Sequence, residues 1–264
     1  MFNPQTNRRT NHSGNHDYGL DNQHAAYLPE AVTLFTSAHA RSVGIHYLDR
    51  VSETVAEIRS PSAPPGSPNS RLVVYGNPTQ PEFLGKPYSF IYPPYPSPQS
   101  VAAWTTVPKT GPGLDQGLDT YNTANTVSIW VTHSPPRGRR DAIPLPPLTG
   151  CEVLARAIAR ARPALSVFGH YHSDHGAELV QWKPRKPDED IYADGGIGET
   201  WEEKIESASV LVDNGEPALI DLSSDFKPGL QTLFVNAAWM TLEKKQVEKR
   251  NKPIVVKLPI SALH

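Results

Sequence analysis

Three short apolar runs along the chain have the composition of buried β-strands. They are "RLVVYG" (71–76), "NTVSIWVTH" (125–133) and "ALSVFGH" (164–170). Continuous apolar runs of this length are typical of strands that are covered on both faces, as in the parallel sheets of α/β proteins. The pattern therefore predicts a buried sheet that contains these three segments.

A helical pattern lies between the second and third runs, in residues 148–163. Its apolar positions form one stripe at helical spacing: Val153, Leu154, Ala157, Ile158 and Ala161. Thr149 and Glu152 have the spacing of a capping box at the helix start, and Pro163 ends the helix. Residues 126–170 are thus a predicted strand–helix–strand unit, which within one sheet requires a right-handed parallel crossover.

The rest of the chain carries weaker patterns. Residues 31–41 have helical spacing, and 42–49 read as a turn and a short strand. The C-terminal third contains strand-like segments at 207–222, 230–240 and 252–260. Because turns join these segments, we expect an antiparallel second sheet there, and hence a mixed α/β fold.

Prolines, of which the chain has 27, cluster at 60–70 and 86–100. Proline lacks an amide donor and fixes φ, so neither segment can form a helix or a central strand. We interpret the first as a flexible insertion, and the second as a surface segment whose aromatic rings pack against the protein. Residues 1–13 are polar and are expected to be disordered, which leaves 14–264 as a single domain.

Charge and cysteine content narrow the class of protein. The formal net charge is −2, with basic residues scattered along the chain, which argues against a strongly basic nucleic-acid-binding protein. One cysteine allows no internal disulfide, and no stretch approaches the about 20 apolar residues of a membrane span. We therefore expect a cytoplasmic protein without membrane contact, whose oligomeric state the sequence does not define.

Histidines follow two of the predicted strands. His133 and His170 each lie just beyond a carboxyl end, where open α/β sheets place their binding sites. Three motifs combine in the chain: "GNHD" (14–17), "THSPPRGRRD" (132–141) and "GHYH" (169–172). Neutral imidazoles bind zinc, iron or manganese, and an amide oxygen can supplement them. The alternative is an ordinary polar loop at the strand ends.

Together these motifs resemble those of the calcineurin-like metallophosphoesterases, and among them the small metallophosphoesterase-domain-containing phosphodiesterases. "PGLQTLFVNAA" (228–238) and "NKPIVVKLP" (251–259) add to a similarity that covers nearly the whole chain after the first dozen residues. The resemblance implies a four-layer α/β/β/α sandwich with divalent metal ions (manganese, iron or zinc) at the carboxyl ends of the strands. It also implies hydrolysis of a small phosphodiester by a metal-activated water.

The resemblance assigns metal ligands residue by residue. Asn15, His133 and His170 would bind one ion, and His172 would bind the other. Two such ions would clamp the phosphoryl oxygens and acidify a bound water.

It also assigns catalytic and substrate-binding positions. His16 would be the acid that protonates the leaving oxygen, and Asp17 would orient its ring. Arg137 and Gly138 match the substrate-binding positions of the family, and the arginines at 139–140 could add further guanidinium groups, which match phosphate oxygens in a bidentate fork.

The chain departs from the family at the first two motifs. It contains neither an Asp-x-His nor a Gly-Asp-x-x-Asp sequence, the motifs that open the family's core and supply its bridging carboxylate. We therefore expect a truncated domain that lacks its first core strands. Three ligands remain for a mononuclear site that could still activate water, whereas a two-metal site is incomplete.

Three functional hypotheses follow. The first is a metal-dependent phosphoesterase shortened at its N-terminus, and the second is a catalytically inactive relative that binds metal or a partner through its Pro/Tyr-rich face. A plain nucleotide-binding α/β module is less favoured, because no phosphate-binding glycine loop is present. Histidines outside the motifs, such as His24 and His175, are expected to be surface or packing residues, and Cys151 a buried packing residue.

Overall fold

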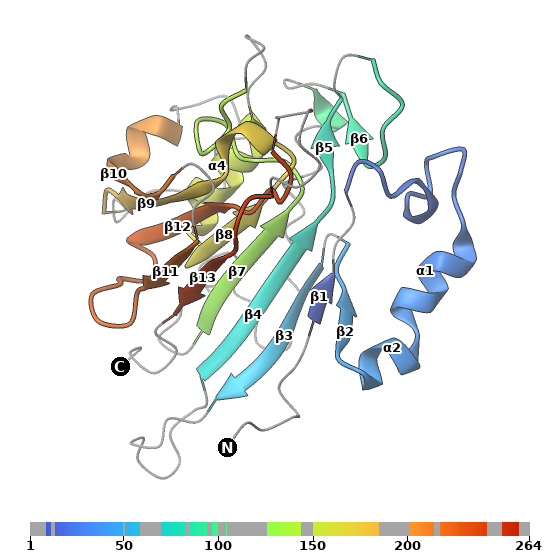
Figure 1. Cartoon of the computed structure of the whole chain (residues 1–264), viewed down its shortest axis with the longest axis horizontal. Coiled ribbons are helices and arrows are strands. Elements are labelled where there is room, and N and C mark those ends of the chain that lie inside the picture. Colours follow the sequence, from blue (N-terminus) through green and yellow to red (C-terminus); the bar gives the residue numbers. More distant parts are fainter. Residues whose placement is uncertain are drawn as a thin grey trace.

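The structure is a computed structural model of the chain. It describes residues 9–11, 14–49, 51–58, 70–82, 85–93, 97–99, 104, 126–143, 150–184, 201–213, 217–241 and 250–258. Its largest element is a seven-stranded sheet with the strand order β10-β9-β12-β8-β7-β4-β3 (Figure 1). In chain order these strands are β3 (Val51–Ile58), β4 (Ser70–Asn77), β7 (Thr126–Thr132), β8 (Leu165–Phe168), β9 (Gly176–Trp182), β10 (Ile205–Val212) and β12 (Gln231–Asn236).

The centre of the sheet is parallel, as the sequence predicts. The three apolar runs form β4, β7 and β8, which pair in parallel as neighbours, and β12 continues the parallel part beside β8. Helix α4 (Glu152–Ala161) connects β7 to β8. The mixed α/β class and the parallel strand–helix–strand unit are therefore confirmed.

Side chains alternate between the two faces of the sheet. Trp130 of β7, Phe168 of β8 and Phe234 of β12 belong to one buried cluster with Leu154 and Ile158 of α4. The opposite face contacts β11 (Ala218–Asp221) and β13 (Ile254–Lys257), which form a two-stranded parallel sheet. The residues that join these two sheets include Leu165, Val167, Leu233, Val235, Ile220 and Val256. Three layers result: α4, the main sheet and the β11–β13 pair.

The C-terminal third differs from the predicted antiparallel second sheet. Strand β10 pairs with β9 and β12 pairs with β8, so both belong to the main sheet. Strands β11 and β13 pair with each other in parallel, and β12 lies between them along the chain. The prediction was wrong because it paired segments that are neighbours in sequence, whereas a crossover through the main sheet separates them.

The N-terminal part forms a smaller unit beside β3 and β4 (Figure 1). The predicted helix at 31–41 is two helices, α1 (Pro29–Thr36) and α2 (Ala38–Ser42), because Ser37 starts α2 by accepting a hydrogen bond from the Ala40 amide at 3.1 Å. Strand β2 (Ile45–Tyr47) pairs in parallel with β1 (Arg9–Asn11), which lies in the segment expected to be disordered.

Short elements complete the described part of the chain. They are β5 (Gln80–Pro81) and β6 (Ile91–Tyr92), which pair in parallel, and the 3-10 turns η2 (Tyr18–Leu20), η4 (His172–Asp174) and η5 (Trp201–Lys204). Phe90 and Tyr92 are buried, as expected for the aromatic rings of the second proline-rich segment. The insertion at 60–70 lies outside the described residues apart from Ser70, which opens β4.

Helix α4 starts differently from the prediction. Its N-cap is Cys151, whose Sγ accepts a hydrogen bond from the Leu154 amide at 3.3 Å, while Thr149 lies outside the described residues. Glu152 forms an ion pair one turn further along α4 instead of closing a capping box. The helix ends at Arg162, a left-handed C-cap with a φ of 48°, immediately before the proline that was expected to end it.

Cys151 also joins a buried hydrogen-bond chain. Trp104 donates through Nε1 to the Tyr92 hydroxyl at 3.0 Å, and this hydroxyl lies 2.7 Å from Cys151 Sγ. Burial raises the pKa of the Cys151 thiol to about 11 and also raises the pKa of Tyr92. Both groups therefore stay neutral at pH 7, which fits a packing role for Cys151 and not a nucleophile.

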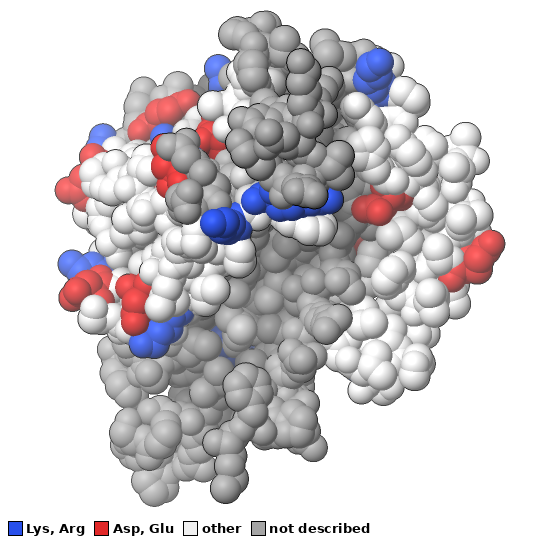
Figure 2. Space-filling view, in the orientation of Figure 1, with Lys and Arg blue, Asp and Glu red and all other residues white. Residues whose placement is uncertain are grey.

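No helix in the described part of the chain is long and apolar enough to cross a membrane. On the face drawn in Figure 2, basic and acidic side chains of the described residues are interspersed. The described residues show no broad positive area in that view, in keeping with the net charge of −2.

The Tyr92→Phe substitution should lower the free energy of unfolding by about 1–3 kcal/mol, because it leaves a buried indole N–H without its acceptor. Urea unfolding of the variant and of the wild type measures this difference. Tyr27→Phe is the matched control, since the Tyr27 ring is only half-buried. Equal unfolding midpoints for wild type and Tyr92→Phe would show that the hydrogen-bond chain does not stabilise the core.

Candidate functional site

The carboxyl ends of β7 and β8 bring two histidines to the same edge of the sheet. The register pairs Val131 with Val167, so the chain leaves both strands at the same level. The amide of Gly169 then donates to the carbonyl of His133 at 3.1 Å, which extends the backbone pairing beyond the strands. His133 and His170 follow directly on this edge.

The rings of His133 and His170 are in contact. Their centroids lie 4.6 Å apart, and His133 Nε2 is 3.0 Å from His170 Nδ1. The backbone amide of Asn15 also points at His133 Nε2, at 3.3 Å. Because this amide can only donate, His133 Nε2 acts as an acceptor, and His170 Nδ1 carries the shared proton. The structure thus brings together three of the four predicted metal-ligand residues.

The "GNHD" segment forms a tight loop against this pair. The Asp17 carboxylate accepts from the Gly14 amide at 2.6 Å, and the Asp17 amide donates to the Gly14 carbonyl at 3.0 Å. A Cβ atom on Gly14 would lie only 2.8 Å from His133 Nδ1, so glycine is required for the close approach. Asn15 is buried, and its carbonyl accepts from the Ser89 amide at 3.2 Å.

Gly14→Ala should displace either the loop or the His133 ring and destabilise the fold by about 1–3 kcal/mol, as expected for overpacking. Thermal unfolding and the ¹³C chemical shifts of the His133 imidazole measure the two effects. Gly169→Ala is the matched control, because a Cβ there would meet its nearest neighbour at 3.8 Å, an ordinary contact. If the two variants gave the same imidazole spectrum, the packing of Gly14 on His133 would be wrong.

His16 and Asp17 make contacts that differ from their expected roles. Asp17 closes the loop through Gly14, as described above, and does not hold the His16 ring through any bond the structure shows for these residues. The His16 ring lies with Nδ1 3.4 Å from the Tyr18 hydroxyl and packs edge-on against Tyr88, with centroids 5.5 Å apart. Two tyrosines therefore orient His16.

The local environment keeps the imidazoles neutral. Burial, together with the neighbouring His172 and His16, lowers the pKa of His170 to about 4. Burial and His16 also lower the pKa of His172. Removal of water disfavours the cationic form, and each nearby imidazole would repel a second positive charge. The rings thus keep the lone pairs that metal ions bind at pH 7.

The backbone at His170 is held in an uncommon conformation. Its φ is 67°, in the left-handed region that residues with a Cβ rarely adopt. Asn236, at the end of β12, supports the loop by donating to the carbonyls of Tyr171 (2.9 Å) and Arg140 (3.0 Å). Its Oδ1 accepts from the amide of Ala238 at 3.0 Å. No pattern in the sequence indicates this role of Asn236.

The predicted substrate-binding residues contact the protein itself. Arg137 forms an ion pair with Glu152 of α4 at 3.2 Å, and its side chain is 52% exposed. The Gly138 amide donates to the Asp141 carboxylate at 2.8 Å, and the Gly150 amide donates to the same oxygen at 2.7 Å. In this arrangement both residues contribute to fixing the loop that follows β7.

The two following arginines anchor the loop that carries His172. Arg139 pairs with Glu178 at 3.3 Å, and Arg140 pairs with Asp174 at 2.9 Å and with Asp213 at 2.5 Å. Arg140 also donates to the carbonyl of His175 at 3.0 Å. These ion pairs tie the loop after β7 to β9, to η4 and to the residue that follows β10.

Arg140→Gln should lower the free energy of unfolding by about 2–4 kcal/mol, since it leaves partly buried carboxylates without their partner. Arg137→Gln removes an exposed ion pair and should cost about 0–1 kcal/mol. Urea unfolding of both variants tests the contrast. A larger effect at Arg137 than at Arg140 would contradict the assigned roles.

The imidazole pair fits two positions around one divalent ion. Two nitrogens bound to a zinc ion at about 2.0–2.1 Å are about 2.9 Å apart at a right angle and about 3.3 Å apart in a tetrahedron. The observed 3.0 Å falls in this interval. Among the described residues, however, no three His, Cys, Asp or Glu side chains are grouped to hold a metal ion. His172 has no such group around it. The contact of Asn15 with the pair is made by its backbone N–H, a donor that binds no metal ion, so a third ligand from this residue would have to be its side-chain oxygen.

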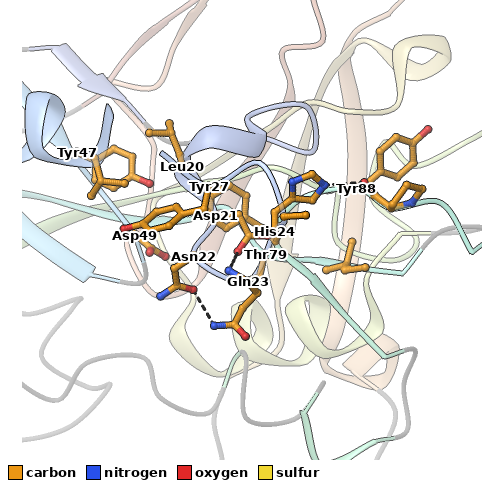
Figure 3. A pocket seen from close by; sticks show the side chains of 15 residues that line it. Leu20, Asp21, Asn22, Gln23, His24, Tyr27, Tyr47, Asp49, Thr79 and Tyr88 are labelled. Carbon is orange, nitrogen blue, oxygen red and sulfur yellow. Dashed lines mark hydrogen bonds between the residues drawn. The ribbon is translucent and has the colours of Figure 1, made fainter. Parts of the chain in front are cut away.

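A cavity of about 420 Å³ lies beside Tyr88, the residue that packs against His16 (Figure 3). Tyr88 lines it while contacting His16, and His24 lines it while stacking on Tyr18 with centroids 4.5 Å apart. We call it the aromatic pocket. Its lining residues are Leu20, Asp21, Asn22, Gln23, His24, Ala25, Tyr27, Val32, Tyr47, Asp49, Thr79, Pro87, Tyr88, Phe90 and Ile91. No sequence motif indicates this pocket, because its lining residues come from four separate segments of the chain.

Comparisons with known proteins do not establish a family. No protein-family model matches the chain. The chain is similar to a probable rhamnogalacturonate lyase C of Emericella nidulans, with 29% identity over 173 residues. The matched region covers 64% of this chain but only 13% of the length of the lyase. A crystal structure aligns to 63% of this chain and 52% of its own chain with 16% identity and a TM-score of 0.36, a likeness that carries no argument about fold or function.

Proposed function

We propose that the protein is a metal-dependent phosphoesterase that holds one divalent ion, manganese, iron or zinc, through Asn15, His133 and His170. The observation that carries this proposal is the 3.0 Å separation of His133 Nε2 and His170 Nδ1 at the carboxyl edge of two parallel strands. Metal binding would displace the proton shared by these nitrogens, and the ion would lie to one side of the line between them once the rings had turned toward it. The substrate class is a small phosphodiester.

The four-layer α/β/β/α sandwich of the calcineurin-like phosphoesterases is part of the proposal. In support, α4, the seven-stranded sheet and the β11–β13 pair lie in the order of three such layers. The resemblance of the three motifs gives further support. The similarity to a probable lyase covers only 13% of that protein, so it does not indicate a lyase reaction for the matched part.

A divalent ion at this position would supply a Lewis acid that lowers the pKa of water and offsets phosphoryl charge. Side chains of the protein would donate the proton and position the phosphoryl group. His16, oriented by Tyr18 and Tyr88, is the candidate donor of a proton to the leaving oxygen. His172, which is neutral at pH 7, is available to contact a phosphoryl oxygen or the attacking water, and Arg140 holds its loop in place through Asp174.

His170→Ala should abolish both metal binding and hydrolysis. Loss of a residue that hydrogen-bonds to a metal ligand typically lowers metal affinity or activity by about 10–100-fold. Loss of a ligand itself should therefore lower them by about 100-fold or more. Metal content after dialysis against Mn²⁺ or Zn²⁺, together with hydrolysis of bis-p-nitrophenyl phosphate, measures this. His39→Ala is the control, because His39 lies exposed on α2. Activity that survives His170→Ala would defeat the assignment.

A catalytically inactive relative is the second candidate. Two observations favour it: among the described residues no group of three His, Cys, Asp or Glu surrounds a metal position, and the predicted phosphate-binding Arg137 is paired with Glu152. The same measurements separate the two. Near-stoichiometric metal without hydrolysis in the wild type would support the inactive relative, and hydrolysis that requires metal would exclude it.

A further inference from the structure

The aromatic pocket is built on the same segment that supports the imidazole pair. Residues 87–91 supply four of its lining positions, and the amide of Ser89 in this segment holds the carbonyl of Asn15 at 3.2 Å. Tyr88 is the shared wall, because its ring lines the pocket and packs edge-on against His16. A molecule in the pocket would therefore lie next to the group proposed to protonate the leaving oxygen.

The shape of the pocket depends on a clamp at Asp21. The buried Asp21 carboxylate accepts from the Phe90 amide at 2.6 Å and from the Gln23 amide at 2.9 Å. Phe90 has a φ of 57°, which is unfavourable for a residue with a large side chain. The clamp thus holds a strained aromatic residue in the wall and ties it to the loop that forms the rim.

Four aromatic rings line the pocket: Tyr27, Tyr47, Tyr88 and Phe90. In Figure 3, Tyr47 and Asp49 lie at one end and His24 and Tyr88 at the other, with Tyr27 between them. None of the lining residues is a lysine or an arginine, whereas two are aspartates. These described residues do not offer a phosphate site, and the ring surfaces favour a flat apolar group that packs by stacking or edge contact.

We propose that the aromatic pocket binds the aromatic or arylalkyl part of a phosphodiester whose phosphoryl group lies at the imidazole pair. This inference rests on the proposed function, which it extends to the organic part of the substrate. The volume of about 420 Å³ is within the usual range for small-molecule pockets, about 300–1,000 Å³. The amides of Asn22 and Gln23 at the rim suit a polar substituent on the ring.

Two phosphodiesters with the same leaving group test the proposal: phenyl p-nitrophenyl phosphate and methyl p-nitrophenyl phosphate. We expect kcat/KM for the phenyl ester to exceed that for the methyl ester by about tenfold or more, the ratio that corresponds to about 1.4 kcal/mol of ring burial. Val32→Trp places a bulky side chain in the pocket wall and should abolish this preference. Leu34→Trp lies on the same helix at a position that is 65% exposed, and it should retain the preference.

A binding measurement on the metal-free protein separates this inference from the proposed function. Benzyl alcohol should shift the methyl resonances of Leu20 and Val32 in a saturable way, and Val32→Trp should abolish the shift at Leu20. Ala25→Trp gives a second lining variant if the first unfolds in a thermal melt. The absence of a saturable shift in the wild type would overturn the inference. A phenyl-to-methyl ratio of kcat/KM that Val32→Trp leaves unchanged would also overturn it, although the proposed function would then stand. Saturable binding without hydrolysis of either ester would support the pocket as an aromatic site and overturn the proposed function.

Discussion

The parallel pairing of β7 with β8 is the constraint on which the candidate site depends. Helix α4 makes this pairing possible, because its apolar face covers the strands that it connects. The register then carries both chain segments to the same edge, and the bond from the Gly169 amide to the His133 carbonyl prolongs it. The two imidazoles meet there as a consequence of backbone geometry, and side-chain attraction is not needed to bring them together.

The sequence predicts this central unit because its signals are local. A continuous apolar run, a helical stripe and a second run define the crossover, and the rule for open α/β sheets places His133 and His170 at its carboxyl edge. The pairing of β11 with β13 could not be predicted from the sequence, since pairing between distant segments leaves no periodic pattern. For the same reason, the aromatic pocket was not predicted from the sequence.

The arginines after β7 show why a motif does not fix a role. The sequence places three guanidinium groups near a proposed phosphate site, and charge alone suggests that they bind substrate. In the structure each one meets a carboxylate on another element: Glu152 on α4, Glu178 on β9 and Asp174 in η4. The cost of leaving a partly buried charge unpaired decides these contacts, and this cost depends on tertiary neighbours that the sequence does not display.

The packing of Gly14 on the His133 ring also affects the order of folding. The Asn15 amide and His133 are 118 positions apart in the chain, whereas His133 and His170 are separated by 37. Closing the longer loop carries the greater entropic penalty, so the crossover unit can form before the N-terminal segment docks on it. Docking of the GNHD segment is then a late event in folding, and partly folded chains would present the two imidazoles without the hydrogen bond from the Asn15 backbone amide.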